Sequence, residues 1–104
     1  MTDDKLIQVE VDGMVVAEAT LTTSADAQAQ AAVHVEPGHL PSGTRSQVAT
    51  AVNEAVVAES AEHLTATLPR GDAELVTELR AHLDHASLRS AGATSILEGD
   101  VRQP

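Results

Sequence analysis

The sequence predicts a single α+β domain with the element order β-β-β-α-β-α-β. Its 104 residues match the length of one ordinary domain. Apolar and polar residues alternate from Leu6 to Val35, and the following segments change between helical and strand spacing. We place the domain at residues 6–98, and we expect residues 1–5 to form a disordered N-terminus and residues 99–104 a frayed C-terminus.

The first third of the chain predicts a three-stranded antiparallel meander, with Asp12-Gly13 marking its first hairpin. A two-residue turn there would pair odd positions with even ones and place Glu18 under the apolar face. A three-residue loop from Val11 to Gly13 keeps odd positions together. We therefore expect the three-residue loop, with Gly13 in the left-handed region, and a second turn over residues 22–26.

The remaining sequence alternates between helices and strands. Thr44 and Gln47 fit a capping box, and the helical stripe that follows them consists of Val48, Ala51, Val52, Ala55 and Val56. The fourth strand is predicted by the alternating Leu64, Ala66 and Leu68. A second helix is expected after Asp72, with its inward face formed by Leu75, Leu79, Leu83 and Ala86. Residues 88–98 are expected to form a fifth strand, weakened by Gly92.

Two strand–turn–helix segments share a motif. Leu40-Pro41-x-Gly43-Thr44 and Leu68-Pro69-x-Gly71-Asp72 lie 28 positions apart. Each places a capping side chain, Thr44 or Asp72, at the expected start of a helix. The match indicates either two similar turns with the same capping requirement or two repeated units, and two copies are too few for a repeat protein.

Composition and charge exclude several classes of function. The formal charge of −10 and the pI of about 4.6 argue against nucleic acid and anionic membranes as partners, because both are bound through Lys and Arg. The absence of Cys excludes thiolate chemistry and Cys-ligated metals, and the absence of aromatic residues excludes base-stacking platforms and a tyrosine general acid. No apolar run is long enough to span a membrane, so we expect a cytoplasmic protein.

The apolar residues of the chain are mostly small. Eighteen are Ala, whereas Leu, Ile and Val together number 24. Because such a chain builds a thin core, we expect it to bury more apolar surface at a sheet edge, in a homodimer or against another protein partner. Five Arg against one Lys, together with the many Ala and Val, indicate a bacterial genome rich in G and C.

Two segments carry a resemblance to a known family. The segment Val9-Glu10-Val11-Asp12-Gly13-Met14-Val15-Val16-Ala17-Glu18-Ala19, followed by Val33-His34-Val35-Glu36-Pro37, resembles the GNAT family of N-acetyltransferases. That family has an acidic-Gly-x-x-Val-Gly hairpin, a strand that ends in Val-x-Pro, and a glycine loop leading into its coenzyme-binding helix. The resemblance covers residues 6 to about 98 and implies the central and C-terminal part of that fold, without its first strand and first two helices.

This chain departs from the family pattern where the family binds coenzyme A. Only Gly43 stands in the expected glycine loop, with Pro41 before it and Arg45 after it, and there is no Tyr to serve as the family's acid. Proline removes an N–H donor, and a side chain hinders close approach of the backbone. Our first hypothesis is therefore a non-catalytic, GNAT-like binding or regulatory domain. The alternative is a small acyl-CoA-dependent N-acyltransferase or acyl-CoA binder with His34 or Glu36 as its base.

The candidate cofactor-binding residues lie at the start of the first helix. This set combines free backbone N–H groups, a positive helix end, hydroxyl groups and a guanidinium, and consists of Ser42, Gly43, Thr44, Arg45 and Ser46. It would hold the phosphates of coenzyme A, or it is simply a capped helix start. The same element order also occurs in a ribosomal-protein fold that contacts RNA, which the negative charge argues against.

The histidines give no defined site. His34, Glu36 and His39 lie at the end of the third strand, and a face of the second helix is predicted to carry Glu74, Glu78, His82 and His85. Either group has donors that bind metals in proteins, but a charged outer surface is the simpler interpretation. We assign no native metal and no catalytic residue.

Overall fold

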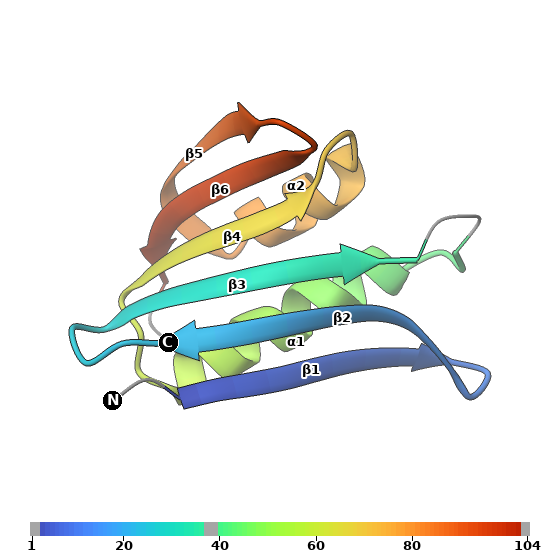
Figure 1. Cartoon of the computed structure of the whole chain (residues 1–104), viewed down its shortest axis with the longest axis horizontal. Helices are drawn as coiled ribbons and strands as arrows, with labels where there is room; N and C mark the ends of the chain where they lie inside the picture. Colours follow the sequence, from blue (N-terminus) through green and yellow to red (C-terminus); the bar gives the residue numbers. More distant parts are fainter. Residues whose placement is uncertain (1–2, 37–39, 103–104) are drawn as a thin grey trace.

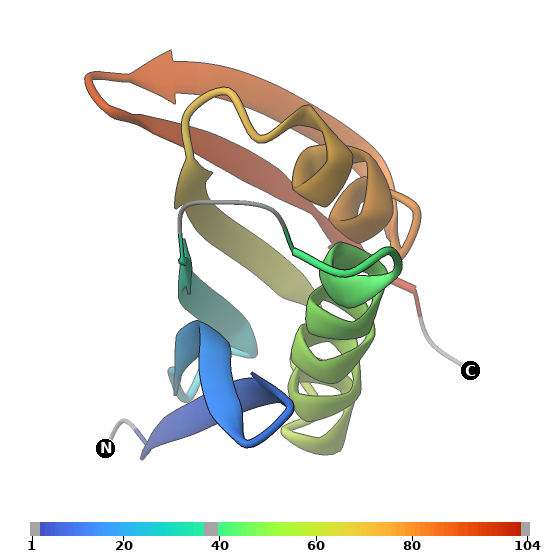
Figure 2. The same ribbon diagram turned by 90° about the vertical axis from the view of Figure 1, so that its right-hand side faces the viewer.

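A six-stranded sheet with two helices packed on one face forms the molecule (Figures 1 and 2). The computed structural model describes residues 3–36 and 40–102, so the expected strand end at Pro37 lies outside the described residues. The strands are β1 (Asp3–Val11), β2 (Met14–Thr23), β3 (Gln28–Val35), β4 (His63–Pro69), β5 (Leu83–Ala91) and β6 (Thr94–Val101). The helices are α1 (Thr44–Ala58) and α2 (Ala73–Arg80). Neither helix in the described part of the chain is long and apolar enough to cross a membrane.

The strand order is β1-β2-β3-β4-β6-β5, and only β3 and β4 run parallel. The predicted α+β class and the meander of the first three strands are confirmed, although the sheet as a whole is mixed. Pairing between β3 and β4 runs from Gln28↔His63 to Ala32↔Thr67. Beyond this last pair, the ends of β3 and β4 no longer pair with each other. The two strands therefore separate where each leads to a helix.

The core lies between the sheet and its two helices, which also pack against each other (Figure 2). Alternate residues of β2, β3 and β4 are buried on this face, and the residues between them face solvent on the other. The largest fully buried side chains are Leu21, Leu64, Leu68, Leu75, Leu79, Leu97, Val48, Val52 and Val56. The other buried apolar residues of the central strands β2, β3 and β4 are mostly Ala, which allows the helices to lie close to these strands.

The three-residue loop expected in the first hairpin is wrong. Val11 pairs directly with Met14, so the turn is the two-residue Asp12-Gly13, with φ of 52° and 80°. Both angles are left-handed, the geometry that matches the twist of a two-residue hairpin. A bulge between Val9 and Glu10 then shifts the register, and Val9 pairs with Ala17. The odd-with-odd pairing of the strand body is therefore correct, but a bulge produces it and the loop does not.

The region after Asp72 differs most from the prediction. α2 ends at Arg80, and Leu83 and Ala86 belong to β5. The four-residue spacing of Leu75, Leu79 and Leu83 continues a helical pattern past the true helix end, because Leu83 is buried by pairing with Val101 in β6. The expected single strand over residues 88–98 is a hairpin, since Gly92 takes a left-handed φ of 61° at its turn.

Both ends of the described chain are more ordered than expected. Residues 3–5 belong to β1 and pair with residues 21–23 of β2. The Thr22 hydroxyl donates to Asp4 Oδ1 at 2.8 Å, and Lys5 Nζ lies 3.1 Å from Glu59 Oε1. At the other end, β6 reaches Val101, which is buried. Strand pairing near both ends of the chain therefore extends the ordered domain beyond residues 6–98.

Candidate functional site

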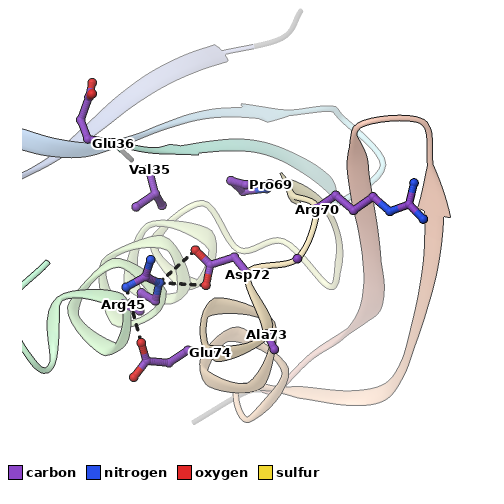
Figure 3. Close-up of a pocket in the computed structure, with 9 residues that line it drawn as sticks. Val35, Glu36, Arg45, Pro69, Arg70, Asp72, Ala73 and Glu74 are labelled. Atoms are coloured by element: carbon purple, nitrogen blue, oxygen red, sulfur yellow. Dashed lines mark hydrogen bonds and ion pairs between the residues drawn. The ribbon is translucent and has the colours of Figure 1, made fainter. Parts of the chain in front are cut away.

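Both helices begin at the same edge of the sheet, because parallel strands β3 and β4 end there (Figure 1). A hollow of about 480 Å³ lies between the two helix starts and the separated strand ends. Figure 3 shows the residues that line it, which are Val35, Glu36, Arg45, Pro69, Arg70, Gly71, Asp72, Ala73 and Glu74. We call this hollow the interhelix cleft.

Asp72 dominates the interhelix cleft. It is the N-cap of α2, as predicted, and its Oδ1 accepts a hydrogen bond of 3.1 Å from the backbone N–H of Leu75. The same carboxylate accepts from Arg45 Nε at 2.8 and 2.9 Å, and its side chain is only 11% exposed. Asp72 therefore lies between a positive helix end and a guanidinium, which is where an external anion would be held.

The other charged groups of the interhelix cleft make it still less favourable for an anion. Glu74 Oε2 lies 3.6 Å from Arg45 Nη1, and Glu36 lines the opposite side. Arg70 points away from the cleft, and its Nη1 donates to Gly92 O at 3.0 Å (Figure 3). The carboxylates of Asp72 and Glu74 thus both face the inward guanidinium, which is already paired, whereas the Glu36 carboxylate points away from it (Figure 3). The residues present do not fit a pyrophosphate at this position.

The start of α1 is built differently from the predicted capping box. Gly43 is the N-cap, with a left-handed φ of 88° and no side-chain cap, and Thr44 is the first helical residue. The Thr44 hydroxyl donates back to Pro41 O at 2.8 Å, and the residue is buried. Thr44 cannot reach a helix N–H because it already lies inside the helix. The first-turn N–H groups of Arg45 and Ser46 have no protein acceptor in the described part of the chain.

The structure divides the predicted cofactor-binding residues between two hollows. Arg45 faces the interhelix cleft, whereas Ser42, Gly43 and Ser46 line a second hollow of about 510 Å³ on the other side of the α1 start. Its remaining lining residues are Val11, Pro41, Thr44, Gln47, Thr50, Ala51 and Glu54. We call this the hairpin hollow, because the β1–β2 hairpin contributes Val11. The predicted guanidinium and the predicted serines do not converge on one ligand.

The other predicted groups stay apart. The side chains of His34 and Glu36 are 68% and 57% exposed, with His34 Nε2 3.9 Å from Glu36 Oε1, and His39 lies outside the described residues. The expected acidic and histidine face of α2 does not form, because α2 ends before His82. Within residues 3–36 and 40–102, no three His, Asp or Glu side chains gather where a metal ion could be held.

One cluster was missed by the sequence analysis. Asp100 of β6 accepts from His85 Nδ1 of β5 at 3.0 Å, and its other oxygen lies 3.4 Å from His63 Nδ1 of β4. The hydrogen bonds with His85 and His63, in that order, lower the pKa of Asp100 below its ordinary value. No sequence spacing indicates this cluster, because it depends on three strands pairing across distant positions.

Solved structures that resemble the chain are acetyltransferases. A GNAT-family acetyltransferase from Streptococcus pneumoniae superposes with a TM-score of 0.68 at 11% identity, over 95% of this chain and 67% of that one. The GNAT domain of S. lividans PAT gives a TM-score of 0.68 at 13% identity, over 95% of this chain and 61% of that one. The PaiA N-acetyltransferase from Thermoplasma acidophilum, in complex with coenzyme A, gives 0.67 at 10% identity, over 94% and 61%. The chain has a GNAT-like fold.

The chain spans about 61–67% of the length of these three acetyltransferases. No protein-family model and no curated protein matches its sequence. The resemblance derived from the hairpin and the Val-x-Pro strand end is therefore confirmed at the level of the fold.

Two residues of the interhelix cleft, Asp72 and Glu74, were expected from the sequence only as a capping residue and a surface residue. The repeated Leu-Pro-x-Gly motif is the signal that could have brought Asp72 beside Arg45. Motif positions that follow two parallel neighbouring strands must lie at the same end of the sheet, so the two helix starts are neighbours although Asp72 lies 27 positions after Arg45 in the sequence.

Proposed function

We propose that this chain is a non-catalytic GNAT-like domain that binds or regulates another molecule and does not transfer an acyl group. The observation that carries this proposal is the carboxylate of Asp72, which pairs with Arg45 and with the first turn of α2. The protein thereby supplies its own anion at the interhelix cleft. The absence of Tyr from the chain supports the same conclusion, since the resembled family uses one as its acid. The cytoplasmic, bacterial setting expected from the sequence is part of this proposal.

The first test is coenzyme A binding followed by NMR. We expect no chemical-shift changes at residues 69–76 with coenzyme A at about 1 mM, because an added phosphate would be repelled by Asp72 and Glu74. Asp72→Ser keeps a capping side chain but releases Arg45, so this variant should respond more than the wild type. Ser24→Ala, at the remote β2–β3 turn, is the matched control. Wild-type shifts centred on residues 69–76, or acetyl transfer from acetyl-CoA to an amine, would contradict the proposal.

A small acyl-CoA binder remains the second candidate, because of the hairpin hollow. The first-turn N–H group of Ser46 is available there, and Glu54 is the only carboxylate among the described residues that line this hollow. An anion at such a helix start is favoured by the helix dipole. Two similar structures were solved with a coenzyme, one with coenzyme A and one with acetyl-CoA.

Ser46→Asp separates the two candidates. A binder would show shifts at residues 41–54 that Ser46→Asp removes, since the new carboxylate would repel a phosphate at the first turn of α1. Ser60→Asp adds the same charge beyond the other end of α1 and should leave binding unchanged. If the wild type shows no such shifts, the acyl-CoA binder is excluded and the non-catalytic domain stands.

A further inference from the structure

A third hollow, of about 250 Å³, lies between α2 and the β5–β6 hairpin (Figure 2). The turn that leads into α2 separates it from the interhelix cleft, since the residues of that turn border both. The described residues that line this third hollow are Gly71, Asp72, Ala73, Val76, Thr77, Leu88 and Ser95. We call it the α2 hollow.

The distinctive group of the α2 hollow is the hydroxyl of Ser95. Ser95 is 7% exposed and lies on the same face of β6 as the buried Leu97. Thr44 is also buried, but its hydroxyl donates to Pro41 O. Within residues 3–36 and 40–102, the Ser95 hydroxyl has no hydrogen-bond partner. A buried hydroxyl without a partner costs free energy, so a molecule that enters the hollow and bonds to Ser95 is favoured.

The walls of the α2 hollow are apolar and small. α2 contributes Ala73 and Val76, whereas its larger Leu75 is buried in the core. β5 contributes Leu88, which is 46% exposed although it lies on the helix-covered face, opposite the buried Leu97. The small side chains of α2 therefore leave room beside Leu88, and a ligand in that room would remove apolar surface from water.

Volume limits the size of such a ligand. An apolar cavity of about 150 Å³ holds a molecule as large as benzene. A hollow of about 250 Å³ therefore accommodates a branched chain of about five carbons with one polar group.

Charge favours a neutral ligand. Asp72 is the only charged residue among the described residues that line the α2 hollow. Its carboxylate already accepts hydrogen bonds from Arg45 Nε and from the N–H of Leu75. An anion would be repelled by this carboxylate, and a cation would find its charge already compensated by Arg45. A serine hydroxyl both donates and accepts, so it matches a neutral group that does the same.

We propose that the α2 hollow binds a small neutral molecule with a short branched aliphatic body and a carboxamide group. The carboxamide bonds to the Ser95 hydroxyl, and the aliphatic body packs against Ala73, Val76 and Leu88. This binding goes beyond the proposed function and does not depend on it, because the α2 hollow is too small for coenzyme A and its single carboxylate disfavours phosphate.

The test is an NMR titration of the full chain at pH 7 with isovaleramide. We expect saturable chemical-shift changes at residues 71–77, Leu88 and Ser95, with a Kd of about 1–10 mM, as is usual for so small a ligand. Isovalerate has the same aliphatic body and a negative charge, and should bind at least about tenfold more weakly. No saturable change with isovaleramide at about 50 mM, or equal binding of the two molecules, would overturn the proposal.

Ala73→Leu tests the location of the site, because the larger side chain fills the hollow. Ala73 is an exposed residue of a helix, and Leu is a good helix former, so this variant should fold. It should abolish the binding of isovaleramide. Ala58→Leu, at an exposed position of α1, is the matched control and should bind as the wild type does. Equal binding by the two variants contradicts the proposed site.

Ser95→Ala tests the role of the hydroxyl. The variant should fold, since it removes a hydroxyl that makes no hydrogen bond within the described residues, and it should bind isovaleramide about fivefold more weakly. Ser90→Ala is the matched control, because Ser90 pairs with Ser95 across the hairpin and does not line the hollow. If Ser95 holds only a water molecule, Ser95→Ala leaves the affinity unchanged, which contradicts the proposal. No measurement here uses coenzyme A, so the failure of this proposal and of the proposed function are separate results.

Discussion

The starts of α1 and α2 follow the same sequence motif and differ in structure. In both turns a glycine is left-handed, with φ of 88° at Gly43 and 89° at Gly71. α1 begins directly after its glycine, whereas α2 begins one residue later, after Asp72. The equivalent residue of the first motif, Thr44, is therefore inside its helix and donates to Pro41 O.

One side chain accounts for the difference in chemistry between the two helix starts. A carboxylate can only accept hydrogen bonds, so Asp72 receives Leu75 N–H and Arg45 Nε together. A threonine hydroxyl can donate, and Thr44 satisfies a carbonyl and leaves two N–H groups of α1 open. One helix start is thus occupied by the protein's own anion, and the other stays open to solvent at the hairpin hollow.

The largest effect is expected from Asp72→Ala. It removes the cap of α2 and leaves Arg45, which is 23% exposed, without its main partner. We expect a loss of about 2 kcal/mol in the free energy of unfolding, measured by urea denaturation. Thr44→Val removes only the hydroxyl bond to Pro41 O, which still accepts from the N–H of Thr44, and should cost about 1 kcal/mol or less. Equal losses would mean that the two helix starts are energetically alike.

Replacing each turn glycine tests what the two starts have in common. A Cβ at Gly43 or Gly71 meets nothing within 4 Å, so the cost of Gly→Ala comes only from the left-handed backbone. That cost is about 1 kcal/mol per site and should be equal in the two turns. Thermal or urea unfolding of the two variants measures it. A clear difference between them would show that the turns diverge in the backbone as well as in the capping side chain.

A double-mutant cycle measures the coupling free energy between Arg45 and Asp72, the ion pair that distinguishes the start of α2 from the start of α1. Arg45→Met combined with Asp72→Ser should give a coupling of about 1 kcal/mol, because this pair is close and largely shielded from water. The cycle of Arg45→Met with Glu74→Gln should give a coupling of about 0.3 kcal/mol. Arg45 Nη1 lies 3.6 Å from Glu74 Oε2, and the Glu74 side chain is 65% exposed. If the second coupling equals the first, the interhelix cleft is a network and Asp72 has no special place in it.

The sequence allowed prediction of those parts of the fold whose periodicity is local. The alternation in β2, β3 and β4 and the stripe through Val48, Val52 and Val56 correspond to the buried face as observed. The prediction failed at the boundary between α2 and β5, where one helical spacing of Leu residues runs through both elements. Leu83 continues the spacing of α2 but is held in β5 by β6, and no local signal distinguishes these outcomes.

The candidate site was predictable only in part, for a related reason. The start of α1 was recognised from its own residues, but the fate of Arg45 depends on Asp72, which arrives through the parallel pairing of β3 and β4. The sequence predicted Thr44 as the N-cap, but Gly43 is the N-cap and Thr44 is the first helical residue. This shift of one residue is enough to prevent the Thr44 hydroxyl from reaching a first-turn N–H. The residue at which a helix starts depends on the exact backbone angles of the preceding turn, and a turn rich in Gly, Pro and Ser is compatible with more than one set of angles.

The smallest expected effect concerns Asp100, a surface carboxylate that contacts His85 and His63. It serves as a comparison for Asp72, which is largely shielded from water. Because the folded protein lowers the pKa of Asp100, the unfolded chain binds its proton more readily. This contribution to stability is therefore present above the ordinary pKa of an aspartate and is lost as the pH falls through the lowered value. Urea unfolding from about pH 7 to pH 2.5 should show a wild-type advantage over Asp100→Asn that shrinks only at the acidic end. His85→Gln, which removes the first cause of the shift, should reduce the same advantage, whereas the loss in Asp72→Ala should be evident already at neutral pH. If Asp100→Asn leaves the pH dependence unchanged, the histidine contacts of Asp100 do not contribute to stability.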